Sequence, residues 1–318
     1  RSKMNRYILL LITSLVAISV SAQRITHDFR DVSMSKALKM IEANTSKYKI
    51  NFIYNELEDF TVTTSIDKKT VPDAIGDVIG FYPIRMTVDG DNIFVECIQK
   101  ENTKLIGEVI DKRGQPIVYA NISLLSAKDS TFINGGVSNL AGKFVIPCSA
   151  KHALVKVSCI GYKTKYVEWT SGEECDVKMV ENSKVLGEVV VKGHRNFIKS
   201  TNTGLSISMD NNPLSKLSSA VDAIRKMPMI DGSGNDISVL GKGTPEIYIN
   251  QRKVRNMSEV SQLSPQNIKS VDIITNPGAQ YGSDVKSVIV IHTKRLNSGL
   301  AGVLKLTESQ SEVSSAST

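Results

Sequence analysis

The spacing of apolar residues changes twice along this chain, and that change limits the folds open to it. Residues 24–99 combine helical spacing with short strand-like runs, whereas residues 104–180 contain strand-like runs alone. Residues 186–295 return to the mixed pattern. A length of 318 residues is typical of two or three domains. We therefore predict a multidomain chain with a small α+β domain, an all-β sandwich and an α/β domain, in that order.

The first mixed region carries signals for two helices and a hairpin. Ser33 stands before an apolar stripe with helical spacing and can cap that helix. Thr70 and Asp73 resemble a capping box before a second stripe. Residues 89–92, Asp-Gly-Asp-Asn, separate two strand-like runs and predict a tight turn.

Turn signals also organise the rest of the chain. In residues 104–180 they recur about every 8–12 residues, Asn139-Leu140-Ala141-Gly142 among them, which is typical of a β-sandwich. In residues 186–295 a helical stripe stops at Met227-Pro228. Val288–Ile291 is continuously apolar, so it is expected to be a strand buried on both faces.

The N-terminus has the parts of a signal peptide in their usual order. A positively charged residue precedes the apolar run Ile8–Val20, and small residues follow it. We predict a signal peptide over residues 4–22, cleaved between Ala22 and Gln23. The run is shorter than the ~20 residues that a membrane-spanning helix needs, and an uncleaved anchor is the alternative. The mature chain is expected to be exported.

Chemically reactive residues are few and scattered. The chain has four histidines and four cysteines but no H-E-x-x-H, C-x-x-C or G-x-S-x-G motif. We therefore predict no catalytic, cofactor-binding or metal-binding residue and no enzyme activity. An oxidising compartment permits disulfides, but Cys97 and Cys159 lie in apolar strand-like runs, which favours buried free thiols. His292 lies in a similar run and is interpreted as a core or rim histidine.

The net charge of +7 comes from residues 1–22, which carry +3, and residues 186–295, which carry +5, while the last 23 residues carry −1. Residues 23–185 hold 21 basic and 21 acidic residues, whereas residues 186–295 hold 14 and 9. No dense basic stripe with interleaved aromatics occurs, so nucleic-acid binding is not indicated. The basic excess is either a solvated surface or a contact with an acidic partner or a polar barrel lumen.

Several separated motifs in residues 186–295 occur in the order found in one known family. They resemble the plug domain of TonB-dependent outer-membrane receptors. Gln251 stands where the plug has glycine, which puts the geometry of that turn in question. The matching segments are Ser219–Pro228, Ile247–Val254, Asn267–Gly282 and Val288–Arg295.

The two preceding regions fit the same family. Residues 105–170 look like a carboxypeptidase-regulatory-like sandwich of prealbumin type, and residues 25–98 look like a secretin/TonB N-terminal signalling domain. This order is similar to the SusC-like receptors of Bacteroidetes-type bacteria. The resemblance implies domains at residues 24–99, 104–180 and 186–295. Residues 296–318 would be the start of a truncated barrel or a disordered tail.

The resemblance implies an outer-membrane importer of a bulky nutrient, such as a glycan, siderophore or peptide, energised by the TonB complex. These domains would face the periplasm or lie inside the barrel. An inner-membrane anti-sigma regulator and a surface lipoprotein are further implied partners. TonB would add a strand at Glu188, Val189, Val190 and Val191, three of which are β-branched. The alternative is that this segment is the first strand of the plug.

Residues 296–318 cannot supply a transmembrane β-barrel of ~22 strands, so that barrel is essentially absent from the chain. We expect an N-terminal fragment of a receptor. The rival interpretation is a soluble periplasmic interaction adaptor without transport activity, and an enzyme of unrecognised type is a third.

Overall fold

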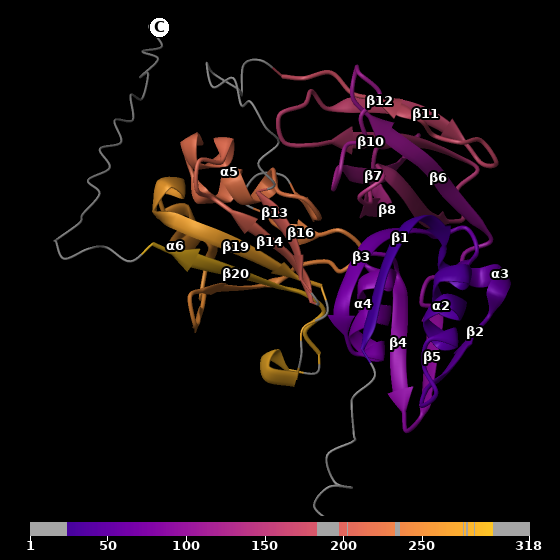
Figure 1. Ribbon diagram of the computed structural model, residues 1–318. Coiled ribbons are helices and arrows are strands. Elements are labelled where there is room, and N and C mark those ends of the chain that lie inside the picture. The colour runs from indigo at the N-terminus through magenta and orange to yellow at the C-terminus, as the bar shows by residue number, and fades with distance from the viewer. Residues whose placement is uncertain are drawn as a thin grey trace, which may run out of the picture.

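The computed structural model describes residues 24–182, 197–201, 203–232, 236–275, 277, 279–282 and 284–294. Both the predicted cleavage site, Ala22 and Gln23, and the segment Glu188–Val191 lie outside the described residues. The described chain is a mixed α+β protein with several small sheets, as its sequence pattern predicted. Figure 1 shows three regions, which we call the first region (residues 24–99), the sandwich (residues 103–182) and the third region (residues 197–294).

The first region alternates strands and helices around one apolar core. Its elements are β1 (Ile25–Ser33), α2 (Met34–Ala43), β2 (Lys49–Phe52), α3 (Tyr54–Leu57), β3 (Thr61–Lys69), α4 (Val71–Ile79), β4 (Ile84–Asp89) and β5 (Asn92–Cys97). Strand β1 pairs with β3, and β5 lies between β2 and β4. The apolar faces of α2 and α4 pack into the core with these strands.

The two helices and the hairpin that the local signals predicted all form. The Thr70 hydroxyl accepts a hydrogen bond from the Asp73 backbone N–H at 3.3 Å and caps α4. Asp89 and Asn92 pair across the β4–β5 turn, where Gly90 has φ +57°. Ser33 stands at the N-cap of α2, as predicted, but its side chain makes no capping hydrogen bond. Ser33 still pairs with β3 as the last residue of β1.

The sandwich consists of two sheets that share a second core. Its strands are β6 (Thr103–Ile110), β7 (Asn121–Ser126), β8 (Phe132–Val137), β9 (Lys143–Cys148), β10 (His152–Ser158), β11 (Lys165–Thr170) and β12 (Val177–Lys178). One sheet has the order β11-β10-β7-β8 and the other the order β12-β6-β9. Alternate residues of β6 and β10 point into the space between them, which is the pattern of strands with one buried face.

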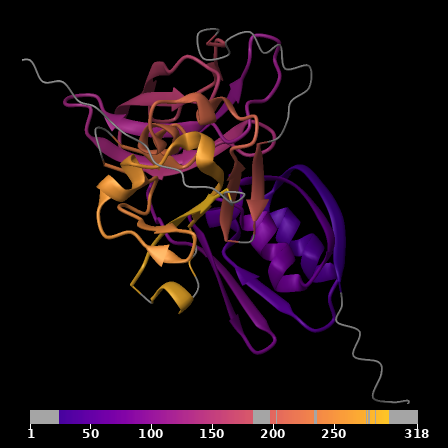
Figure 2. The ribbon, with the colours of Figure 1, turned by 90° about the vertical axis from the view of Figure 1, so that its left-hand side faces the viewer.

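The third region is built on a sheet with the order β13-β14-β19-β20-β17-β18. Its strands and helices are β13 (Ile198–Thr201), β14 (Gly204–Ser208), η1 (Pro213–Lys216), α5 (Ala220–Arg225), β15 (Ile230–Asp231), β16 (Ser238–Val239), β17 (Glu246–Ile249), β18 (Arg252–Lys253), α6 (Met257–Ser261), η2 (Pro265–Asn267), β19 (Ile268–Ile274), η3 (Ala279–Tyr281) and β20 (Val288–Thr293). This region packs against the sandwich, in front of which it lies in Figure 2.

Two sequence features of the third region are settled by the sheet. Val288–Ile291 is buried throughout, because β20 lies between β19 and β17, and the predicted doubly buried strand is confirmed. Gln251 does not disturb the turn between β17 and β18. Asn250 takes the left-handed conformation there, with φ +56°, so position 251 does not require glycine.

The four cysteines all lie in the described residues and are free thiols. The apolar runs predicted buried free thiols at Cys97 and Cys159; this is confirmed for Cys97, whereas Cys159 is only partly buried. Cys97, Cys148 and Cys175 are buried. Across the described ranges, no helix is long and apolar enough to cross a membrane.

Candidate functional site

The structure does not test the predicted TonB-contacting residues, Glu188–Val191. They belong to the segment between Asn182, where the described sandwich ends, and Phe197, where the third region resumes. Within the described part of the chain, no group of three or more His, Cys, Asp and Glu side chains could hold a metal ion. The best-defined polar site is instead a junction where all three regions meet, and it is built around Asn139.

Asn139 begins the turn between β8 and β9 and shapes it with its own side chain. Its Oδ1 accepts hydrogen bonds from the backbone N–H of Ala141 at 2.9 Å and of Lys143 at 3.0 Å. This is the geometry that favours asparagine in tight turns. Gly142 completes the turn with φ +77°, and a Cβ there would lie 2.6 Å from the Val109 carbonyl oxygen. The turn that the sequence predicted is therefore confirmed.

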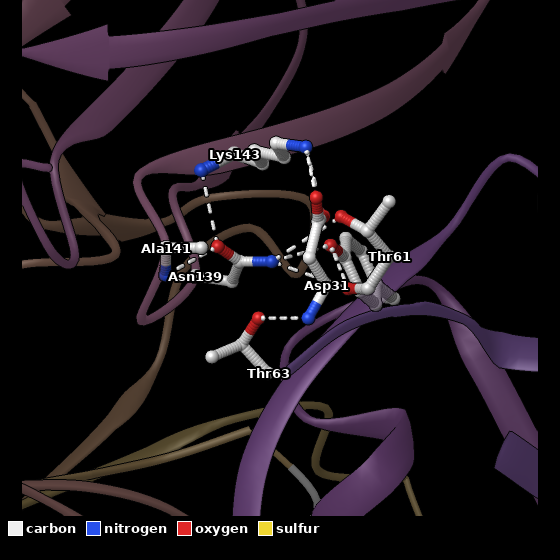
Figure 3. A network of polar contacts seen from close by, with 7 residues as sticks. Asp31, Thr61, Thr63, Asn139, Ala141 and Lys143 are labelled. Carbon is white, nitrogen blue, oxygen red and sulfur yellow. Dashed lines mark hydrogen bonds and ion pairs between the residues drawn. The ribbon is translucent and has the colours of Figure 1, made fainter. Parts of the chain in front are cut away.

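The other end of the Asn139 amide joins the sandwich to the first region (Figure 3). Its Nδ2 donates to the Thr61 carbonyl at 3.2 Å and lies 3.4 Å from the Tyr82 hydroxyl. The Tyr82 hydroxyl in turn donates to the same Thr61 carbonyl at 2.8 Å. One side chain thus fixes the turn of the sandwich and attaches it to the start of β3.

An ion pair lies beside this contact. Lys143 Nζ lies 2.8 and 2.7 Å from the two carboxylate oxygens of Asp31. Asp31 sits in a register shift of β1, with φ +50°, and its backbone N–H donates to the Thr63 hydroxyl instead of to the β3 backbone (Figure 3). A bulge of this kind redirects a side chain, and here it coincides with a carboxylate that reaches the sandwich.

The junction surrounds a small pocket of about 70 Å³. Burial raises the pKa of the Tyr82 hydroxyl, although its hydrogen bonds with Thr61 and Asn139 partly oppose the shift. Burial also raises the pKa of Tyr119, whose ring packs edge-on against Phe81 with 5.9 Å between ring centroids. The lining comes from all three regions, since Thr61–Thr64, Tyr82, Tyr119, Asn139 and Ser200 all contribute.

The polar contacts of this junction attach the sandwich to the first region. Its polar groups are hydroxyls and amides that already bond to one another, and its charged groups are paired. The sequence predicted the turn but not its docking, because Asn139 and Thr61 are 78 residues apart. The local signal for this docking contact is the Asn139 side chain itself, because its Oδ1 shapes the turn and its Nδ2 remains able to donate to another part of the chain.

A second polar cluster lies on the third region's sheet. His292 Nε2 is 2.7 Å from Asp272 Oδ2, and the Ser206 hydroxyl donates to Asp272 Oδ1 at 2.5 Å. In a Ser-His-Asp catalytic triad the histidine contacts the serine hydroxyl, whereas here the Asp272 carboxylate lies between His292 and Ser206. The cluster is a cross-strand polar contact, and His292 is the satisfied rim histidine that the sequence predicted.

Comparison with known proteins finds a family model that matches the sandwich and a relative that is similar to much of the chain. Residues 105–191 match the model of the CarboxypepD_reg-like domain. The chain is 25% identical over 254 residues to the TonB-dependent receptor SusC of Bacteroides thetaiotaomicron. That match covers 70% of this chain and 24% of the relative, so the chain spans about a quarter of the relative's length.

Solved structures add only weak likenesses. The ferripyoverdine receptor of the Pseudomonas aeruginosa outer membrane is 10% identical, with 86% of this chain and 28% of that chain covered and a TM-score of 0.21. The 5-hydroxyisourate hydrolase of Klebsiella pneumoniae is 12% identical, with 25% and 98% covered and a TM-score of 0.20. Scores this low carry no weight for function. The sequence matches carry the assignment: this chain contains a CarboxypepD_reg-like domain and is a distant relative of the TonB-dependent receptor SusC.

Proposed function

We propose that the chain is the part of a TonB-dependent receptor that blocks and opens the path of an imported nutrient. The observation that carries this proposal is the relationship to SusC over 70% of the chain. The CarboxypepD_reg-like match within the same span supports it. On this proposal the chain works as a receptor component and not as an enzyme.

The three regions would have separate roles in such a receptor. The third region, within residues 186–295, would be the plug, and residues 24–99 would signal to an inner-membrane regulator. The receptor would act in the outer membrane, with these regions inside its barrel or facing the periplasm. The nutrient would be a glycan, a siderophore or a peptide, and a surface lipoprotein would help to deliver a glycan.

TonB would bind at Glu188–Val191 by adding a strand. Strand addition forms main-chain hydrogen bonds, and the three consecutive valines favour the extended conformation that these bonds need. The segment connects the sandwich to the third region, so a pull on it would act on both.

The test measures binding of the periplasmic domain of TonB, from the same organism, to this chain by calorimetry. Replacing residues 189 and 190 by proline removes two backbone donors, and we expect binding to fall at least tenfold. The matched control replaces the same two valines by threonine, which keeps the β-branched shape and both donors. Equal affinity of the proline variant and the wild type would reject this TonB site.

Cell fractionation tests the wider proposal. We expect the receptor in the outer-membrane fraction, and we expect uptake of its nutrient to depend on TonB. Recovery of the whole product in the soluble periplasm would favour the adaptor without transport activity.

A further inference from the structure

The outer face of one sandwich sheet is buried, although the outer face of a sandwich usually meets water. In β7, Ile122 and Leu124 point into the sandwich core, so Asn121 and Ser123 point outward. Asn121 is nevertheless only 7% exposed and Ser123 only 4%. Another part of the chain must therefore cover this face.

The third region covers it. On β8, a Cβ added to Gly135 would lie 3.0 Å from Leu240 Cδ2, and Val137 belongs to the apolar core of the third region. On β10, Lys156 pairs with Asp231 at 3.6 Å. Val137 is the cross-strand partner of Asn121, and Gly135 and Lys156 are both partners of Ser123, so these residues form one continuous face. We call these five residues the docking face.

Asn121 is the polar centre of the docking face, and it holds the loop Met227–Ile230. Its Nδ2 donates to the carbonyl oxygens of Met227 and Ile230, each at 3.1 Å. Its Oδ1 accepts a hydrogen bond from the Met229 backbone N–H at 2.6 Å. One side chain from the sandwich thus serves three backbone groups of the third region.

This loop needs a partner because of its own sequence. Pro228 prevents α5 from continuing, and Met229 takes the left-handed conformation, with φ +66°, which is unfavourable for a residue with a side chain. Met227, Met229 and Ile230 are all at most 4% exposed, so water cannot satisfy their backbone groups. The bonds from Asn121 meet this requirement.

We propose that the sandwich is a docking platform for the third region, and that Asn121 is the residue that holds the loop Met227–Ile230 in place. On this proposal the CarboxypepD_reg-like domain positions its neighbour and is not a passive spacer. The contact joins the two regions independently of the segment that links them in sequence.

Hydrogen–deuterium exchange on the whole chain tests this role. Asn121→Leu keeps the approximate size of the side chain but removes all three hydrogen bonds. We expect amide exchange in a peptide covering residues 227–232 to accelerate at least tenfold, while peptides from β6 and β10 stay unchanged. The matched control is Ser123→Ala on the same buried face of β7. Its exchange should equal that of the wild type.

A charge swap gives a second test that spares the core of the interface. Lys156→Glu places two carboxylates together, and we expect exchange in residues 227–232 to rise severalfold. Adding Asp231→Lys restores an opposite pair and should restore slow exchange. Unchanged exchange in both Asn121→Leu and Lys156→Glu would overturn the proposal. So would equal acceleration by Ser123→Ala, or acceleration by Asn121→Leu that extends equally to β6 and β10.

Discussion

Gly107 leaves no room for a side chain, and replacing it by alanine should be strongly destabilising. An alanine Cβ at this position of β6 would lie 2.0 Å from the carbonyl oxygen of Cys175 and 2.8 Å from Phe144 Cζ. Ordinary contact begins at 3.4 Å, so the chain at Cys175 would have to retreat by about 1.4 Å. That movement would break the hydrogen bond from the Cys175 N–H to the Ile106 carbonyl, now 2.8 Å long.

The expected loss of stability in Gly107→Ala has two contributions. Overpacking a core typically costs about 1–3 kcal/mol, and a lost backbone hydrogen bond costs about 1 kcal/mol. We therefore expect Gly107→Ala to lower the free energy of unfolding of the sandwich by about 3 kcal/mol. The single tryptophan of the chain, Trp169, is buried in the sandwich and reports its unfolding directly.

The assay is urea unfolding followed by Trp169 fluorescence. The control is Gly136→Ala in β8, where the nearest atom to an added Cβ is Ile146 Cγ1 at 3.4 Å. Its unfolding free energy should stay within about 1 kcal/mol of the wild type. If Gly107→Ala also stays within that range, the reasoning from backbone proximity is refuted.

Two further predictions concern titration. The backbone N–H of Gln115 bonds the Asp111 carboxylate at 2.8 Å and, as the largest influence, lowers its pKa. The ionised Asp111 carboxylate should therefore stabilise the sandwich fully above the usual pKa of aspartate, and this stabilisation should be lost as pH falls through the lowered pKa. We expect Asp111→Asn to destabilise the sandwich at pH 7 but to make little difference in strong acid, as followed by Trp169 fluorescence. Burial raises the pKa of Cys159 to about 12 and of Cys175 to about 11. Both thiols should resist alkylation by iodoacetamide at pH 8 until the chain unfolds, as measured by mass spectrometry. The free energy of unfolding should fall above about pH 9, because these thiols ionise in the unfolded chain before they ionise in the folded one.

Features determined by neighbours in sequence could be predicted. The hairpin at residues 89–92 forms because Gly90 can take a positive φ, and the turn at Asn139 forms because its side chain bonds the next few N–H groups. Val288–Ile291 was predicted as a buried strand because an unbroken apolar run cannot face water on either side.

Features determined by contacts across the chain could not be predicted in the same way. Asn121 lies 106 residues before Met227, and no local pattern relates the two. The start of α2 is a second example. The N–H of Met34, at the start of α2, donates to the Phe60 carbonyl at 2.7 Å, so a distant residue supplies a partner that local sequence could not reveal.

The position of β20 also affects the order in which the regions can fold. Strand β17 precedes β20 in sequence but pairs with it in parallel, and β19 pairs with its other edge. The sheet therefore cannot assemble until residue 293 has left the ribosome, whereas the first region and the sandwich can fold earlier. Until then β17 and β19 expose unpaired edges, which favour aggregation. We expect the newly made chain to depend on chaperones during that interval.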